Sequence, residues 1–248
     1  MRTSVEVVAR RGRGGHTELP VVRATGQLAV RRTGPATVHL VATAFGPLGG
    51  DDATVRLVVE AGATLTVRTV AAAVALPSRA GSAPSVQRVH ATVDGVLDLR
   101  PEPTVVTAGA FHVGELTAEL GPDAALTASE LVLLGRWGEQ PGRWTGTTRI
   151  TRDGRAVLHT TVGLGPGAPA WGPLFAPRAY ASTAFLDAPS SGPVPVAEVR
   201  TGPAAVRLPL AGGWVATAWG EALHRVEESL DALTTATGRP AAVGGARG

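Results

Sequence analysis

The sequence Leu126–Trp144, LTASELVLLGRWGEQPGRW, joins an apolar run to a charged, glycine-rich turn. The run from Leu131 to Leu134 has no polar residue, which is typical of a buried strand. Glu130 stands just before the run, and Arg136 and Glu139 lie among the glycines that follow it. Because a buried strand fixes the chain on either side of it, we expect these polar side chains to be held at the edge of a hydrophobic core.

The composition of the whole chain predicts a strand-rich core built from small aliphatic side chains. Hydrophobic residues make up 44% of the 248 residues but aromatic residues only 4%, so valine, leucine and alanine must fill the core. Valine favours strands, and the 32 glycines and 19 prolines supply turns. This length fits one large all-β domain or two smaller ones. We expect a single β-rich domain over residues 1–248, with a disordered tail at about 239–248.

Neither the charge pattern nor the apolar segments point to nucleic acid or to a membrane. The net charge is +3, but all 23 basic residues are arginine, and only Arg10, Arg11 and Arg13 cluster, without a nucleic-acid-binding motif. The N-terminal segment lacks the apolar core of a secretory signal, and no apolar stretch approaches the roughly 20 residues that span a bilayer. With no cysteine for disulfides, the chain is predicted to be a soluble, cytoplasmic protein.

Alternating apolar and polar residues, bounded by glycine or proline, predict strands along most of the chain. The expected strands are 27–31, 37–43, 54–60, 64–69, 86–93, 96–99, 104–107, 112–120, 145–150, 156–162, 180–186, 194–199, 205–208 and 214–218. A glycine corner followed by an apolar alternation recurs at Gly62, Gly95 and Gly121, which suggests stacked antiparallel or helically coiled strands. From Gly220 to about Thr237, apolar residues recur at three- and four-residue steps, so an amphipathic helix is expected near the end of the chain.

Two segments interrupt the strand pattern. Val70 to Leu76, VAAAVAL, has no polar face, so we expect a fully buried strand or a short buried segment. In Arg100-Pro101-Glu102-Pro103, two residues lack the N–H group that a central strand needs, so a bend or a sheet edge is expected there.

Four carboxylates stand where they could take part in chemistry: Asp51, Glu102, Glu130 and Glu139. The simplest interpretation gives them structural roles: the aspartate would cap its turn, and the two later glutamates would pair with Arg136 or Arg143. The alternative is that several of them converge on a polar passage or an interface. There, carboxylates and water can hold a divalent cation weakly and release it.

Other chemistries find less support in the sequence. No Gly-x-Ser-x-Gly or comparable signal marks a hydrolase nucleophile, and the six histidines are too isolated to predict a tight metal centre. Trp137 and Trp144 flank Glu139, which leaves open a carbohydrate hydrolase with Glu130 and Glu139 as acid and base on a β scaffold. A β binding module without a metal role is the third alternative.

Several short motifs follow one another in a recognisable order. They are Gly49-Gly50-Asp51, Pro101-Glu102-Pro103-Thr104, Ala108-Gly109-Ala110, Ser129-Glu130, Leu134-Gly135-Arg136, Gly138-Glu139 and, before the closing helix, Arg207-Leu208-Pro209. Each motif is short, but their order from roughly Gln27 to Leu233 resembles the urease accessory protein family UreD, also called UreH. The resemblance implies a mainly β fold, with stacked antiparallel sheets in a partly helical-coiled, β-helix-like sandwich and a C-terminal amphipathic helix.

The resemblance also implies a function, that of a non-enzymatic chaperone in urease maturation. Such a protein binds the urease apoprotein, recruits the accessory protein UreF and, through it, the GTPase UreG, and helps to pass nickel to the urease active site. No tightly bound cofactor is expected, only transient Ni²⁺.

The resemblance carries over to particular residues. Asp51, Glu102, Glu130 and Glu139 would line a transient nickel path or support it, and the structural support would come from Arg136, Gly49, Gly50 and Gly135. The sequence departs from the family in one place, because the family's polar segment after the second hairpin, often rich in Thr and Gln, is here Thr69–Ala75, TVAAAVA. This departure removes polar and aromatic groups from the segment.

Overall fold

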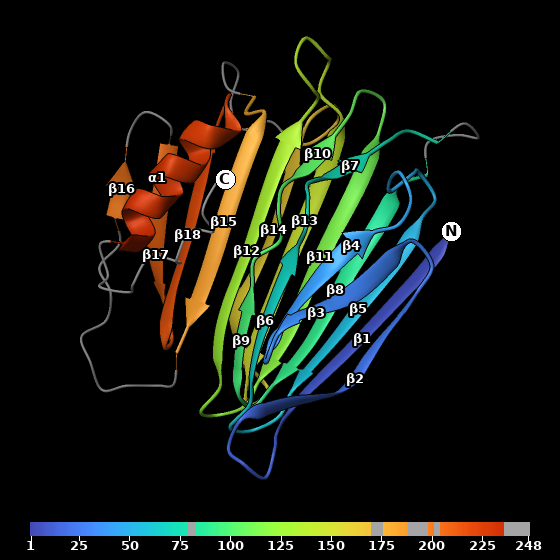
Figure 1. Ribbon diagram of the computed structural model, residues 1–248. Coiled ribbons are helices and arrows are strands. Elements are labelled where there is room, and N and C mark those ends of the chain that lie inside the picture. Colours follow the sequence, from blue (N-terminus) through green and yellow to red (C-terminus); the bar gives the residue numbers. More distant parts are fainter. Residues whose placement is uncertain (79–82, 170–175, 188–197, 201–203, 236–248) are drawn as a thin grey trace, which may run out of the picture.

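The computed structural model describes residues 1–78, 83–169, 176–187, 198–200 and 204–235. Figure 1 shows two β-sheets lying face to face, with a helix against the outer face of one sheet. The predicted tail at about 239–248 and most of the predicted strand 194–199 lie outside the described residues.

The described residues form eighteen strands and one helix. The strands are β1 (Arg2–Arg11), β2 (Thr17–Thr25), β3 (Leu28–Gly34), β4 (Thr37–Ala42), β5 (Asp52–Val59), β6 (Thr64–Thr69), β7 (Ala73–Ala75), β8 (Ser85–Val93), β9 (Val96–Leu99), β10 (Thr104–Val106), β11 (Phe111–Leu120), β12 (Ala125–Leu134), β13 (Arg143–Arg152), β14 (Arg155–Leu164), β15 (Ala179–Leu186), β16 (Glu198–Arg200), β17 (Ala204–Leu210) and β18 (Gly213–Gly220). The helix is α1 (Leu223–Thr235).

The strands form a seven-stranded sheet, here sheet A, and an eleven-stranded sheet, here sheet B. Sheet A has the order β14-β13-β11-β8-β5-β1-β2. Sheet B has the order β16-β17-β18-β15-β12-β9-β6-β4-β3, and β10 pairs with β12 and β7 beside this path. The prediction of a mainly β, sandwich-like fold with a C-terminal helix is therefore confirmed.

The central part of the chain winds as a coil between the two sheets. Strands β5, β8, β11 and β13 of sheet A alternate along the chain with β6, β9 and β12 of sheet B. Neighbours within each series pair in parallel, as the expectation of helically coiled strands requires. The expected antiparallel pairing is wrong for this central part and holds only at the flanks, as in β1–β2, β3–β4, β13–β14 and β12–β15–β18. The reason is geometric, because a chain that enters one sheet once per turn always enters it in the same direction.

The three glycine corners predicted from the sequence carry the chain from sheet A to sheet B. Gly62 takes a left-handed φ of 71° between β5 and β6, so the segment is a tight corner rather than a hairpin. A Cβ atom on Gly95 would lie 2.2 Å from the carbonyl oxygen of Ala63, and one on Gly121 would lie 2.4 Å from an Asp94 carboxylate oxygen. Each corner is therefore stacked directly on the corner before it.

Small aliphatic side chains fill the space between the sheets, as the composition predicts. Val55 and Leu57 of β5 and Leu65 and Val67 of β6 are at most 1% exposed, and each such side chain contributes about 1.5–3 kcal/mol by leaving water. Near one end of the sandwich the core also contains aromatic rings. Trp144 packs there against Tyr180, with ring centroids 5.3 Å apart.

Helix α1 packs on the outer face of sheet B through Val226, Leu230 and Leu233, against β15, β17 and β18. The buried Arg207 side chain of β17 donates from Nη1 to the carbonyl oxygen of Leu233 at 2.7 Å. This bond satisfies one of the carbonyl groups that a helix leaves open at its C-terminal end. No helix in the described part of the chain is long and apolar enough to cross a membrane.

Two segments differ from what the sequence predicted. The hairpin of β1 and β2 at the edge of sheet A was not expected, although Val5, Val7 and Ala9 alternate with polar or less buried residues. The prediction that residues 70–76 are buried is wrong for the first half of the segment, because Val70 is 61% exposed. Those residues leave the parallel ladder of sheet B before β7 begins, so no second layer covers them.

Candidate functional site

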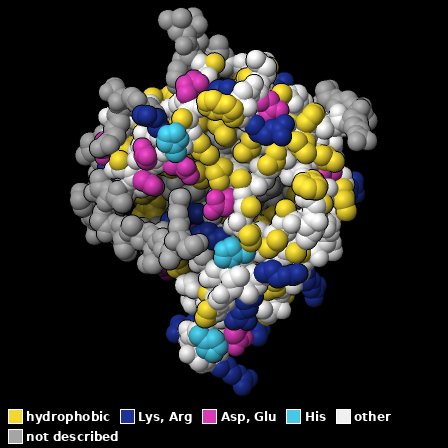
Figure 2. Space-filling model, turned by 45° about the horizontal axis from the view of Figure 1, so that its top comes forward, with side chains coloured by type: hydrophobic (Ala, Val, Ile, Leu, Met, Phe, Trp, Pro, Cys, Tyr) yellow, Lys and Arg dark blue, Asp and Glu magenta, His cyan; other side chains and the backbone are white. Residues whose placement is uncertain are grey.

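The connections that return the chain from sheet B to sheet A are long and lie together at one end of the molecule. We call the described parts of residues 43–51, 70–84, 100–110 and 135–142 the loop end; Figure 2 turns this end toward the viewer. Backbone hydrogen bonds join neighbouring loops, from Gly49 N–H to Leu76 O at 3.0 Å and from Gly135 N–H to Val106 O at 2.7 Å. Every site residue named from the sequence belongs to the loop end except Glu130.

Sheet B is interrupted near the loop end, and a cavity lies between the sheets at this interruption. Strand β12 pairs with β9 over Ala125–Ala128 and with β10 over Val132–Leu134, and the chain turns aside between β9 and β10 at residues 100–103. The bend predicted at the two prolines is thus confirmed. The cavity has a volume of about 130 Å³, and Thr69, Ala71 and Glu102 line it at the break.

Glu130 of β12 lines this cavity, and its side chain is half-buried between the two sheets. Two glycines of sheet A make room for its carboxylate: a Cβ atom on Gly114 would lie 2.8 Å from Oε1, and one on Gly146 would lie 3.0 Å from Oε2. On its own sheet, Glu130 stands directly opposite Ser182 of β15. Burial raises the pKa of Glu130 to about 7, because the surroundings of low polarity disfavour the charged form.

Other polar side chains also line the cavity, although most of its wall is apolar. His112 is 3% exposed and its Nδ1 atom lies 2.9 Å from Ser85 Oγ; burial lowers the pKa of His112 to about 4, so the ring is neutral at pH 7. The cavity is also lined by Gln87, Thr148, Thr160 and Ser182. Burial, together with the nearby Glu130 charge, raises the pKa of the neighbouring Tyr180.

Glu102 lies at the outer boundary of the cavity, where its side chain is exposed. Its backbone N–H group donates to Thr69 Oγ1 at 2.8 Å, which holds the bend against the end of β6. The carboxylate contributes to a negative field that reaches helix α1. Burial, and then the charges of Asp231 and Glu102, raise the pKa of Glu227. Acidic groups from two elements therefore lie near the point where sheet B is interrupted.

Asp51 does not line the cavity with Glu102 and Glu130. It is 7% exposed and contacts the amino group of Met1, and its Oδ2 atom accepts the Leu48 N–H at 2.9 Å. Burial alone would raise the pKa of Asp51, but the amino group and the hydrogen bonds from Leu48 and Gln27 lower it. This carboxylate closes the turn that precedes β5, and Gly50 in that turn has a left-handed φ of 87°.

Glu139 also lies outside the cavity, in the exposed turn after β12. Arg136 donates two hydrogen bonds to its carboxylate, from Nε at 3.1 Å and from Nη2 at 3.0 Å. This hydrogen bonding lowers the pKa of Glu139 to about 2. Arg178 donates to the Glu139 carbonyl oxygen at 2.8 Å and lies so close to Gly135 that a Cβ atom there would be 2.6 Å from Nη2. Arg136 thus orders the turn, as the structural interpretation of Glu139 predicted.

The structure therefore places two of the four predicted carboxylates, Glu102 and Glu130, at one cavity. The other two, Asp51 and Glu139, lie outside it. Glu130 and Glu139 do not share the cavity, and Trp137 is fully exposed whereas Trp144 is buried. These positions do not form the facing carboxylates and aromatic platforms that the hydrolase alternative requires.

Sequence analysis missed the residues of sheet A that line the cavity or lie against Glu130, notably Gly114, Gly146 and His112. The available signal was the pair of glycines inside strands, because a strand glycine marks a place where another group comes close. In the described part of the chain, no group of three or more His, Asp or Glu residues is arranged to hold a metal ion. A cation in the cavity would meet scattered oxygen atoms rather than a preformed cage.

Comparison with known proteins agrees with the family resemblance that the motifs carry. A sequence model of the family described as UreD urease accessory protein matches residues 2–246. The chain is 41% identical over 175 residues to urease accessory protein UreD of Streptomyces avermitilis, covering 68% of this chain and 69% of that protein. It is 36% identical over 249 residues to UreD of Parafrankia sp., covering 89% and 83%, and 39% identical over 213 residues to UreD 3 of Streptomyces griseus, covering 81% and 82%. The chain belongs to the UreD family of urease accessory proteins.

Proposed function

We propose that this chain is a non-enzymatic scaffold that binds the urease apoprotein and the accessory proteins UreF and, through UreF, UreG, and assists the delivery of nickel to the urease active site. The observation that carries the proposal is the cavity between the sheets that both Glu130 and Glu102 line, in a chain of the UreD family. Nickel is the cargo in this scheme, held transiently and passed on.

The chemistry of the cavity suits a cargo that must leave again. Its ligands would be carboxylate and hydroxyl oxygens, which hold divalent transition metals more weakly than thiolate or imidazole sets do. A cation must also displace the proton that burial favours on Glu130, because the carboxylate binds a metal only when ionised. Both effects weaken binding and favour release.

The position of the cavity supports docking of the partners near the loop end. Its break in sheet B adjoins the loop end, whose connections differ from the tight corners at the other end of the coil. A scaffold that holds donor and acceptor at its surface raises the effective concentration of one for the other without any covalent step.

The test is urease activation in cells that express the urease subunits, UreF, UreG and this chain. We expect Glu130→Gln, which keeps the shape and removes the charge, to lower the nickel content and the specific activity of purified urease by roughly tenfold or more, the effect typical of disturbing a metal environment. Glu102→Gln should have a smaller effect, because its side chain is exposed. Glu139→Gln is the matched control, since its carboxylate lies outside the cavity.

Copurification of each variant with the UreF homologue shows whether the scaffold is intact. Full activation by Glu130→Gln would contradict a role for the cavity in nickel delivery. Failure of the unaltered chain to bind either UreF or urease at micromolar concentration would contradict the scaffold role itself.

A further inference from the structure

Sheet B extends beyond sheet A on the side of β16 and β17. In the described part of the chain, sheet A ends on this side with β14, whereas sheet B continues past β15 through β18, β17 and β16. Figure 1 shows these last three strands at the left of sheet B, past β14. Helix α1 packs on the outer face of β17 and β18. Their inner face lies past the last described strand of sheet A.

The inner face of these extra strands is apolar and partly exposed. Leu208 of β17 stands beside Val215, and Val215 beside Ala184, which lines the cavity, so Leu208 lies on the inner face of sheet B. Leu208 is 45% exposed, and Val199 of β16, which shares this face, is 72% exposed. On the outer face of β17, by contrast, Ala205 is buried under α1. One face of β17 is therefore packed and the other is not.

Strand β14 forms a free edge beside this apolar face. Among the described residues it pairs only with β13, and this pairing is regular from Leu158 to Leu164. A Cβ atom on Gly163 would lie 3.4 Å from Pro169, so the chain itself covers that end. The stretch 158–162, LHTTV, contains no proline and no lysine, whereas β2 at the opposite edge of sheet A contains Pro20. Such residues normally protect an edge from further pairing, and this stretch of β14 lacks them.

A second copy of the chain does not fit this edge. Two β14 strands would pair antiparallel about a two-fold axis perpendicular to the sheet. Because sheet B of each copy extends past its own β14, the two copies of β16–β18 would then occupy the same layer and collide. The chain's own connections are also poor strands for a ladder, since the segments 165–178 and 187–197 contain seven prolines, which have no N–H group to donate. The edge therefore fits a narrow element from another protein.

We propose that the edge of β14 at Leu158–Val162 accepts an extended segment of a different protein, which pairs with it as an added strand of sheet A. Main-chain hydrogen bonds to β14 would hold the segment, as in other cases of strand addition. The added strand would also lie over the inner face of sheet B near Leu208 and Val199, and it would remove apolar surface there from water.

The alternation along β14 defines the chemistry of this occupant. Leu158 and Thr160 line the cavity on the inner face, whereas His159 and Thr161 are exposed on the outer face. A strand added beside β14 has the same two faces. The occupant is therefore a proline-free segment whose apolar side chains, at alternate positions, face sheet B and whose polar side chains face solvent. Once docked, it would lie beside the wall that β14 gives to the cavity.

Hydrogen exchange of the full chain, followed by NMR, tests the proposal. The probe is a capped peptide of alternating valine and threonine, about nine residues long, which exceeds an ordinary strand. In the free chain, every second amide of 158–162 points away from β13 and should exchange fast. At a peptide concentration of about 1 mM, these amides should exchange at least about tenfold more slowly. The same peptide with a central proline is the matched control and should protect none of them.

A proline in β14 provides a second, independent test. His159→Pro or Thr160→Pro is chosen, according to which of the two amides exchanges fast in the free chain. This change removes an N–H group that points outward and leaves the hydrogen bonds to β13 in place. The variant should lose protection by the peptide and keep nearly the melting temperature of the unaltered chain. His90→Ala alters an exposed residue on the central strand β8 and should leave the protection unchanged.

Three results would overturn the proposal. Slow exchange of all amides of 158–162 in the free, monomeric chain would show that a segment of the chain itself occupies the edge. Equal exchange with and without the alternating peptide would show that the edge accepts no added strand. Protection that grows with the concentration of the chain alone would identify a second copy as the occupant. Each result leaves the proposed role in urease maturation standing, because that role uses the cavity and not this edge.

Discussion

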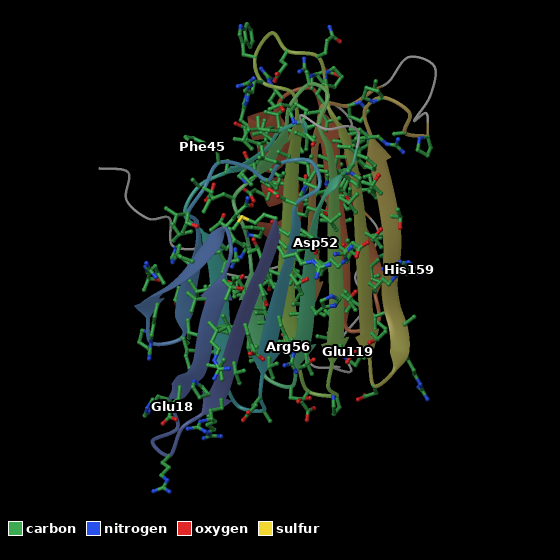
Figure 3. All side chains as sticks on the ribbon, turned by 90° about the vertical axis from the view of Figure 1, so that its right-hand side faces the viewer. Glu18, Phe45, Asp52, Arg56, Glu119 and His159 are labelled. Carbon is green, nitrogen blue, oxygen red and sulfur yellow. The ribbon has the colours of Figure 1, made fainter. Side chains whose placement is uncertain are left out.

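The two ends of the coil are built from the same strands but are closed in opposite ways. At one end, residues 60–63, 94–95 and 121–124 pass from sheet A to sheet B in short, stacked corners. At the loop end, the return connections are longer, and the residues 43–51 and 135–142 carry exposed aromatic rings and paired charges. Figure 3 shows Phe45 at the loop end, far from Glu18 at the opposite end. The corners fix the register of the sheets, which leaves the loops free to carry function.

The largest expected effect is at a stacked corner. Gly95→Ala would place a Cβ atom 2.2 Å from the Ala63 carbonyl oxygen and 2.6 Å from that of Glu60, and both are backbone atoms that cannot move alone. We expect this change to lower the free energy of unfolding by more than about 3 kcal/mol or to prevent folding. Urea denaturation followed by circular dichroism measures the loss.

The control for this prediction lies at the loop end. Gly138 has open space around its Cβ position but a left-handed φ of 71°, so Gly138→Ala should cost only about 1 kcal/mol from backbone strain. If the two substitutions cost the same, the contrast between rigid corners and tolerant loops is wrong.

The next effect concerns Glu130 and depends on pH. Its pKa is about 7 in the folded protein, against 4.5 for an ordinary glutamate, so the folded state binds more protons between these values. The contribution of Glu130 to stability is therefore fully present below about pH 4.5 and is lost as the pH rises through 7, by up to about 3 kcal/mol. Glu130→Gln should remove this loss, so it should be more stable than the unaltered chain at pH 8 and equally stable at pH 4.5.

Thermal unfolding of both proteins across this pH range measures the difference. Equal pH profiles would show that Glu130 is not shielded from solvent, and would weaken the case for the cavity as well. Thr148→Val, which alters the cavity lining without a titrating group, is a control that should keep the pH dependence of the unaltered chain.

The smallest effect is expected at the exposed pair of Arg136 and Glu139. The pKa of Glu139 is lowered to about 2, so the pair stabilises the turn above about pH 4.5 and loses this contribution as the pH falls through 2. Because such exposed pairs contribute little to global stability, Glu139→Gln should leave the melting temperature at pH 7 almost unchanged. Hydrogen exchange of the Arg136 and Glu139 amides should increase, which reports local loosening. A large loss of global stability would show that the turn is part of the core.

Much of the fold could be predicted from the sequence because its signals are local. Alternation of apolar residues gave most of the strands, and the three-and-four-residue spacing of Val226, Leu230 and Leu233 gave the helix. Strand direction could not be predicted in the same way. Parallel and antiparallel strands have the same alternation of apolar and polar residues. They differ in the connection that joins the paired strands, which is a short hairpin for antiparallel strands and a crossover for parallel strands.

The candidate site could be predicted only in part. The sequence showed the proline bend at Glu102 and the polar residue Glu130 before an apolar run. It did not show that the two residues line one cavity, because this depends on where β9 ends and β10 begins along β12. Asp51 and Glu139 carried equally strong sequence signals, and the structure places both in closed turns. A carboxylate beside glycines has the same local sequence whether it closes a turn or lines a cavity. Only its neighbours from other strands distinguish the two cases.

By itself, the sequence determined the elements of this protein: valine-rich strands, glycine corners, a closing helix and the motif order of its family. These features depend on residues a few positions apart, where side-chain size and backbone freedom act directly. Only the tertiary structure decided which carboxylate faces the cavity, that Val70 lies exposed, and that Trp137 projects into solvent. Burial is a property of the whole assembly of two sheets, because it depends on what other parts of the chain cover, and no local pattern contains that information.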